Sequence, residues 1–219
     1  MDLFARSLTA LHSAVDELSD ADFARPSGCS GWVVRDLVCH LIVDAQDVLI
    51  TLVTPDDGDP TRDATSYWDV LTTAPSGDDP LDALIPRLAA AYQEPWLLRY
   101  HFDDLAAAAA RAADLVDATR HVRTKGEVLT AEDYLGAYVL EWTLHHLDLT
   151  SHLHPARALP PPESLARSRE MLQTIAGVTF PAAISDADAL LIGTGRRGPS
   201  TAEVAELGAV TGLIPVVLG

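Results

Sequence analysis

One predicted helix carries a stripe of polar side chains that could do chemistry. Its members recur at intervals of three or four residues, which places them on one helical face. They are Tyr134, Tyr138, Glu141, His145, Asp148 and His152. The neighbouring rows of this helix are largely apolar, so we expect the stripe to face the protein interior. A buried, unpaired Glu141 or His145 would cost several kcal/mol, on the order of the penalty for any uncompensated polar group, so the stripe needs partners.

Glu141 and His145 lie one helical turn apart, where a carboxylate and an imidazole converge on one point. This geometry suits a divalent first-row metal ion, although a direct hydrogen bond between the two side chains explains the same spacing. His40 lies between apolar rows of a second predicted helix, where a lone histidine is more often a hydrogen-bonded core residue than a ligand. Two helices that each carry inward polar groups favour the metal interpretation.

Two further carboxylates follow these histidines. Asp44 comes one turn after His40, and Asp148 comes three residues after His145. Each is a candidate partner that could fix the tautomer of an imidazole. A position on the helix surface explains Asp44 equally well, whereas the inward stripe favours a functional role for Asp148.

Length and charge limit the class of protein. The chain has 219 residues, with 15 Lys and Arg against 32 Asp and Glu, so its formal net charge is −17. Such an acidic chain is a poor partner for nucleic acid. The N-terminus lacks the basic region of a signal peptide, and no apolar run reaches the roughly 18 residues of a membrane span. We therefore expect a cytoplasmic protein with no nucleic-acid or membrane partner.

Hydrophobic periodicity predicts a mainly α-helical chain. Helices are expected over residues 3–18, 31–53, 81–91, 102–119 and 131–152, with Ser30 capping the second and a Thr130–Asp133 capping box opening the last. The acidic connection over residues 55–80 is either a lid or binding loop, or a solvated loop held by Tyr67 and Trp68.

The composition changes after residue 158, and residues 159–219 are expected to form a small mixed α/β region. A helix is predicted over residues 162–178 and a strand over residues 189–192. This strand would lead into a glycine turn that presents Arg196 and Arg197. The two arginines could bind a carboxylate of a ligand, or pair with surface acids.

The sequence resembles the DinB-like superfamily, and within it the mycothiol-dependent maleylpyruvate isomerases. Three segments carry the resemblance: Pro26-x-x-Cys29-x-Gly31-Trp32-x-Val34-x-Asp36-Leu37-x-x-His40-Leu41, Glu141-x-x-x-His145-His146-x-Asp148-Leu149, and Gly193-Thr194-Gly195-Arg196. The resemblance implies a metal-binding four-helix bundle over residues 1–158. It also implies a divalent metal held by His40, Glu141 and His145. Zinc is the first choice, with nickel or iron as alternatives that suit the same ligands.

The resemblance further implies a low-molecular-weight thiol, mycothiol or a similar compound, as cosubstrate. Coordination to a divalent cation favours the thiolate, which is the nucleophile. In an isomerase the thiolate adds to an activated double bond of a small electrophile, rotation about the resulting single bond follows, and the thiolate leaves again. In an S-transferase the adduct is kept or the thiol exchanged. Arg196 and Asp148 are the residues expected to assist this chemistry.

Other functions fit part of the same pattern. A non-catalytic metal- or ligand-binding stress-response protein would keep the bundle and the metal without turnover. Two histidines and one carboxylate also occur in iron oxygenases, although a helical scaffold argues against that analogy. The expected partners are a small electrophile and a thiol, and the expected assembly is a monomer or a homodimer.

Overall fold

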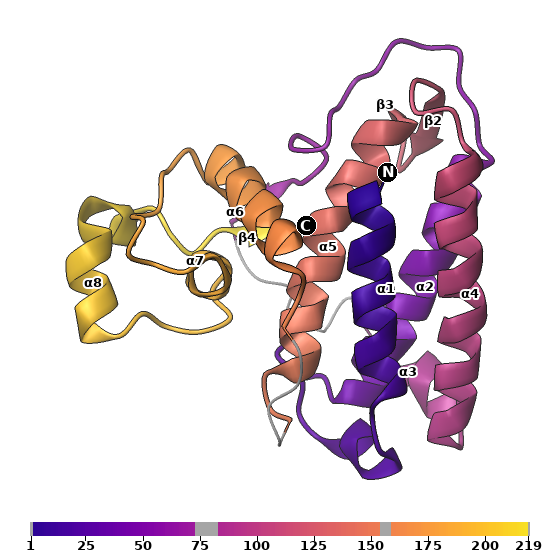
Figure 1. The fold of residues 1–219 in the computed structure, drawn as a ribbon, viewed down its shortest axis with the longest axis horizontal. Coiled ribbons are helices and arrows are strands. Elements are labelled where there is room, and N and C mark those ends of the chain that lie inside the picture. The colour runs from indigo at the N-terminus through magenta and orange to yellow at the C-terminus, as the bar shows by residue number, and fades with distance from the viewer. Residues whose placement is uncertain (1, 73–82, 154–158, 219) are drawn as a thin grey trace.

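Four long helices form the body of the protein. The computed structural model describes residues 2–72, 83–153 and 159–218. The four helices are α1 (Asp2–Asp16), α2 (Val34–Leu52), α4 (Pro95–Leu115) and α5 (Ala131–Thr150). α1 and α2 each lie against both α4 and α5, and the short α3 (Leu84–Ala91) packs on α2 (Figure 1). The predicted mainly helical fold is confirmed.

Hydrogen bonds at the helix ends explain where α5, which carries the polar stripe, and α2, which carries His40, begin. The Thr130 side chain accepts a hydrogen bond from the Asp133 backbone at 3.0 Å, so the predicted start of α5 is correct. The predicted cap at Ser30 is wrong. Gly31 adopts a left-handed φ of 80°, which interrupts the helix, and α2 begins at Val34, where the Asp36 carboxylate accepts the Val33 amide at 3.1 Å.

A β-hairpin precedes α5, where no strand was predicted. Its strands are β2 (His121–Thr124) and β3 (Glu127–Thr130). They pair antiparallel, with His121 opposite Thr130 and Thr124 opposite Glu127. Lys125 and Gly126 form the two-residue turn, with φ values of 49° and 84°. α4 begins earlier than predicted because Pro95 is well tolerated in the first turn of a helix.

The connection after α2 runs over one end of the bundle and leads to β1 (Val70–Leu71) (Figure 1). Thr61 donates its backbone amide to Val128 at 2.8 Å, which ties this connection to the hairpin. β1 pairs antiparallel with β4 (Val217–Leu218) near the end of the chain. Residues 73–80, the rest of the connection considered as a lid, lie outside the described residues.

The C-terminal region contains α6 (Pro162–Ala176), α7 (Asp186–Gly193) and α8 (Thr201–Leu207). The strand predicted over residues 189–192 is wrong, because these residues form the second half of α7. Ser185 caps that helix by accepting the Asp188 amide at 3.1 Å. A run of four apolar residues suits a buried helix as well as a strand, and the cap decides between them here.

Helix α5 is buried on two faces. One face joins the core of the bundle, where Leu135 and Trp142 lie in one cluster with Phe4 of α1. The other face contributes Leu140, Leu144 and Leu147 to a second cluster that contains Leu172, Phe180 and Leu190. Apolar packing on both sides holds the polar stripe of α5 in place. None of the helices in the described ranges is both long and apolar enough to cross a bilayer.

Candidate metal centre

Two pairs of side chains from α2 and α5 meet inside the bundle. His40 and Asp44 lie one turn apart on α2, and Glu141 and His145 lie one turn apart on α5. One donor atom from each of the four lies within 4.8 Å of the others. The structure therefore brings together the three residues that the resemblance implied as ligands, and it adds Asp44 to them.

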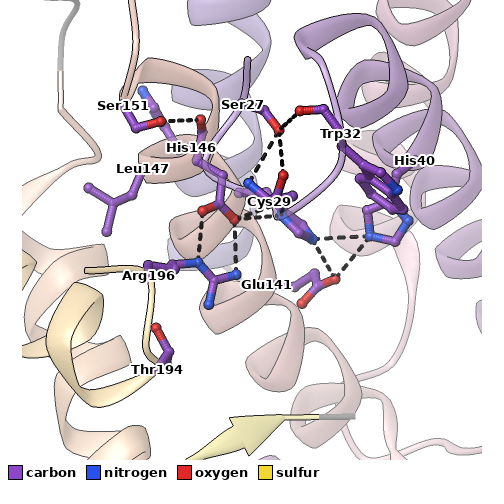
Figure 2. Close-up of polar contacts among 12 residues, drawn as sticks. Ser27, Cys29, Trp32, His40, Glu141, His146, Leu147, Ser151, Thr194 and Arg196 are labelled. Carbon is purple, nitrogen blue, oxygen red and sulfur yellow. Dashed lines mark hydrogen bonds and ion pairs between the residues drawn. The ribbon is translucent and has the colours of Figure 1, made fainter. Parts of the chain in front are cut away.

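The closest contacts of this cluster join its nitrogen and oxygen atoms (Figure 2). His145 Nε2 lies 3.0 Å from His40 Nε2 and 3.0 Å from Glu141 Oε1. His40 Nε2 lies 3.4 Å from Glu141 Oε1 and 3.1 Å from Asp44 Oδ2. Trp32 stands edge-on to the His40 ring, with ring centroids 5.3 Å apart, and so limits its rotation.

Asp148 orients His145 from the opposite side of the imidazole. His145 Nδ1 lies 3.1 Å from Asp148 Oδ2, and because a carboxylate only accepts, Nδ1 carries the proton. Arg196 donates Nε and Nη2 to the two oxygens of Asp148 at 2.8 and 2.9 Å. Cys29 donates its thiol to the same carboxylate, with Sγ 3.3 Å from Oδ2. The protein thus links Arg196 through Asp148 to His145.

The charges of these groups depend on one another. Burial alone would raise the pKa of Asp148, but Arg196 and His145 lower it to about 2. Burial would also raise the pKa of Glu141, and the two histidines hold it well below its usual range. Burial disfavours the charged form of His145, yet Glu141 and Asp148 raise its pKa well above the usual value. Without a metal, a proton on His145 offsets the charge of Glu141.

Asp44 behaves differently from the other carboxylates of the cluster. Burial, its largest influence, raises the pKa of Asp44 to about 6, despite the opposing effect of His40. Asp44 Oδ2 is buried and makes no hydrogen bond of good geometry within the described part of the chain. Such an oxygen retains a lone pair that points into the cluster.

The donor set fits a divalent cation. Because His145 Nδ1 donates to Asp148, the neutral ring presents a lone pair at Nε2 to Glu141 Oε1, 3.0 Å away, which only accepts. Only a proton or a cation between these two atoms makes the contact favourable. Ligands at about 2.0–2.2 Å from a tetrahedral zinc are separated by about 3.4 Å. The donor atoms of His40, Glu141 and His145 lie 3.0 to 3.4 Å from one another, close to that value.

A cavity of about 570 Å³ opens onto the cluster. Its walls are largely aromatic and apolar, with two cationic side chains, Lys125 and Arg196. The lining residues outside the cluster are Trp32, Tyr67, Trp68, Ile85, Lys125, Tyr138, Leu144, Thr194, Arg196, Val217 and Leu218. Elements far apart in the sequence therefore build one pocket around the cluster.

The remaining members of the stripe have other positions. The Tyr134 and Tyr138 hydroxyls donate to Asp47 at 3.1 and 2.9 Å, and Tyr138 also lines the cavity. His152 lies beyond the end of α5 and is exposed, so the inward stripe ends at Asp148. Arg197 pairs with Asp188 and Glu203 outside the pocket, which is the surface alternative considered for it.

Sequence reasoning missed Lys125 and the terminal strand as parts of the pocket. Val217 and Leu218 reach it only because β4 pairs with β1, a contact between the two ends of a long stretch of chain. Lys125 arrives through the unpredicted hairpin. The only sequence signal for it was that Lys125 is the single lysine of the chain.

The fold and the cluster define a helical-bundle protein with an interior histidine–carboxylate site open to a cavity. Residues 4–150 match the family model described as the mycothiol maleylpyruvate isomerase N-terminal domain, and the chain belongs to this family of the DinB-like superfamily. The match spans α1 to α5 and so includes every residue of the cluster, while Arg196 lies outside it. Neither the comparison with curated proteins nor that with solved structures finds a match.

Proposed function

We propose that this protein is a metal-dependent enzyme that uses a low-molecular-weight thiol such as mycothiol. It acts on a small electrophile, either as an isomerase that adds and releases the thiol or as an S-transferase that keeps the adduct. The observation that carries the proposal is the convergence of His40, Glu141 and His145 at a cavity of about 570 Å³. Membership of the family supports the thiol as cosubstrate.

His40, Glu141 and His145 would hold the metal, with zinc the first choice, and Asp44 is placed to serve as a fourth ligand. A divalent cation bound there supplies Lewis acidity, which favours the thiolate form of a bound thiol at neutral pH. Asp148 keeps the proton of His145 on Nδ1, so that Nε2 faces the cluster. Arg196 keeps Asp148 ionised and fixed. In this proposal Asp148 and Arg196 are positioning residues.

The cavity walls support a small organic substrate. Trp68, Leu144 and Val217 offer apolar surface, which favours an organic body over a hydrated ion. Water is displaced from such walls when a ligand binds, and this strengthens the interactions of the charged groups beside it. The pocket therefore combines an apolar binding surface with a polar centre.

Metal content and turnover test the proposal together. Protein purified without added metal or chelator is expected to carry about one divalent ion per chain by elemental analysis. His40→Ala and His145→Ala are each expected to lose it. His12→Ala is the control, since His12 of α1 pairs with Asp103 of α4 and takes no part in the cluster.

The metal-loaded protein is then assayed for thiol-dependent conversion of a panel of activated alkenes and other electrophiles. Stoichiometric metal that survives both histidine substitutions would overturn the metal centre. A metal-loaded protein that consumes no thiol with any electrophile would instead support the non-catalytic binding protein. Oxygen uptake with ferrous iron would support an oxygenase.

A further inference from the structure

The two cationic side chains of the cavity differ in what they already bind. Arg196 donates from two nitrogen atoms to Asp148, so two of the three nitrogens of its guanidinium are already bound within the protein. Lys125 makes no ion pair with any carboxylate of the described residues, although the chain contains 32 acidic residues. Its ammonium lies 5.2 Å from the centroid of the Tyr67 ring. The available positive charge of the cavity is therefore that of Lys125.

The backbone conformation of Lys125 also indicates a function for its side chain. Lys125 holds the first position of a two-residue hairpin turn, with a left-handed φ of 49°. Asn, Asp and Gly are favoured there, because a longer side chain makes that conformation unfavourable. A residue kept in an unfavourable conformation is a reason to look for a function of its side chain.

We propose that Lys125 is a specificity-determining residue that binds the carboxylate of a small monoanionic substrate at the mouth of the cavity. This inference rests on the proposed function and deepens it, because it assigns a charge to the molecule that reaches the metal cluster. Among the described residues that line the cavity, Lys125 is the one cation not paired with a carboxylate, and in a protein of net charge −17 it matches a single negative charge. Tyr67 and Trp68 beside it match an unsaturated or aromatic body.

The position of Lys125 also orients the substrate. Lys125 and the Glu141–His145 pair line the same cavity but belong to the hairpin and to α5. A substrate whose carboxylate is held by Lys125 therefore points the rest of its body along the cavity toward the cluster. The carboxylate itself stays away from Glu141 and Asp44, whose negative charges would repel it.

Benzoate and its neutral isostere benzamide test the charge preference directly. Binding to the zinc-loaded protein is followed by tryptophan fluorescence, since Trp32 and Trp68 line the cavity. The wild-type protein is expected to bind benzoate about fivefold more tightly than benzamide, as one partly exposed ion pair contributes up to about that factor. Lys125→Asn is expected to abolish the preference.

Arg123→Gln is the matched control. It removes a positive charge from the same hairpin, but Arg123 pairs with Asp56 and does not line the cavity, so the preference for benzoate is expected to remain. Lys125→Asn is also expected to keep or raise the melting temperature, because asparagine suits the turn. Loss of binding preference without loss of stability separates recognition from a structural role.

Two results would overturn the inference. They are a preference for benzoate that persists in Lys125→Asn, and no benzoate binding at millimolar concentration. A persisting preference together with a lower melting temperature would assign Lys125 to its contact with Tyr67. The measurement needs no turnover and is repeated after EDTA treatment, so a preference that requires Lys125 stands even if the metal-dependent activity fails.

Discussion

Asp148 connects Arg196 of the C-terminal region to His145 of the histidine–carboxylate cluster through a single side chain. Its carboxylate accepts from His145, Arg196 and Cys29, and its backbone oxygen accepts the Gly28 amide at 2.8 Å. These bonds occupy the buried carboxylate and fix the tautomer of His145. The metal affinity and the stability of the protein should therefore both depend on this residue.

Asp148→Asn tests that dependence. The neutral amide binds Arg196 and His145 more weakly, so zinc affinity should fall about 10- to 100-fold. The free energy of unfolding should fall on the order of 3 kcal/mol, because the largely buried Arg196 loses its counter-charge. Competition with a chromogenic chelator and urea unfolding measure the two effects. Asp188→Asn, which affects the more exposed pair with Arg197, is the control and should leave zinc affinity unchanged.

Asp44→Asn should lower zinc affinity without lowering the stability of the metal-free protein, unlike Asp148→Asn, which should lower both. Burial raises the pKa of Asp44 to about 6, and Oδ2 has no hydrogen bond of good geometry to any described residue, so in the metal-free protein its negative charge is unfavourable. Asparagine should leave the metal-free protein at least as stable, while zinc affinity falls by about tenfold or more. Thermal unfolding without zinc measures the stability of the metal-free variant, and the added stability with zinc measures its zinc affinity. A metal-free variant that is clearly less stable, or one with unchanged affinity, would exclude Asp44 as a ligand.

At the scale of elements, the loop before α2 is fitted closely to α5. A Cβ atom on Gly28 would overlap Asp148 Oδ1 and lie 2.7 Å from the Asp148 Cα, a contact that backbone atoms cannot relieve by rotation. The loop and the helix can therefore approach only because residue 28 is glycine. This approach places Cys29 beside Asp148.

Gly28→Ala should accordingly move the loop away from α5 and lower the free energy of unfolding by about 1–3 kcal/mol. It should also weaken zinc binding, because Asp148 shifts with its neighbours. Gly198→Ala is the control, since among the described residues only its chain neighbours come within 4 Å of the added Cβ, and its φ lies outside the left-handed region. Equal stability of the two variants in chemical denaturation would show that the loop adapts without cost.

The elements that could be predicted from the sequence are those whose signals are local. α5 was predicted to within two residues at its end because its periodicity is long and Thr130 provides a cap. The hairpin before it was missed because its strands are four residues each and its turn, Lys125-Gly126, lacks the usual asparagine. The strand assigned to residues 189–192 failed because a short apolar run does not distinguish strand from helix.

The same distinction between local and long-range signals holds for the residues of the site. Helical spacing and the family resemblance predict His40, Glu141 and His145 as ligands. For Asp44 a position on the helix surface was an equally good explanation, because the direction of its side chain depends on how α2 packs. Lys125 and the strand β4 could not be predicted. Their places in the cavity follow from contacts between distant segments, which no local pattern records.

At the scale of the whole molecule, the C-terminal region shares its core with the bundle. Leu140, Leu144 and Leu147 of α5 pack with residues of α6 and α7, and Arg196 reaches into the site. Ser7 of α1 and Ser164 of α6 also form a buried hydrogen bond at 2.8 Å. The boundary predicted at residue 158 marks a change in composition, but these contacts favour one cooperative unit over two separate domains.

The full chain should accordingly unfold in urea in a single transition, with coincident curves from far-ultraviolet circular dichroism and tryptophan fluorescence. A chain ending at residue 158 would expose the three leucines of α5 and leave Asp148 without Arg196. It should bind a hydrophobic dye such as ANS and bind zinc at least about tenfold more weakly. Arg196→Met in the full chain separates the two causes, since it should weaken zinc binding without exposing the core. Two resolved transitions in the full chain, or a shortened chain as stable as the full one, would show instead that the bundle folds independently.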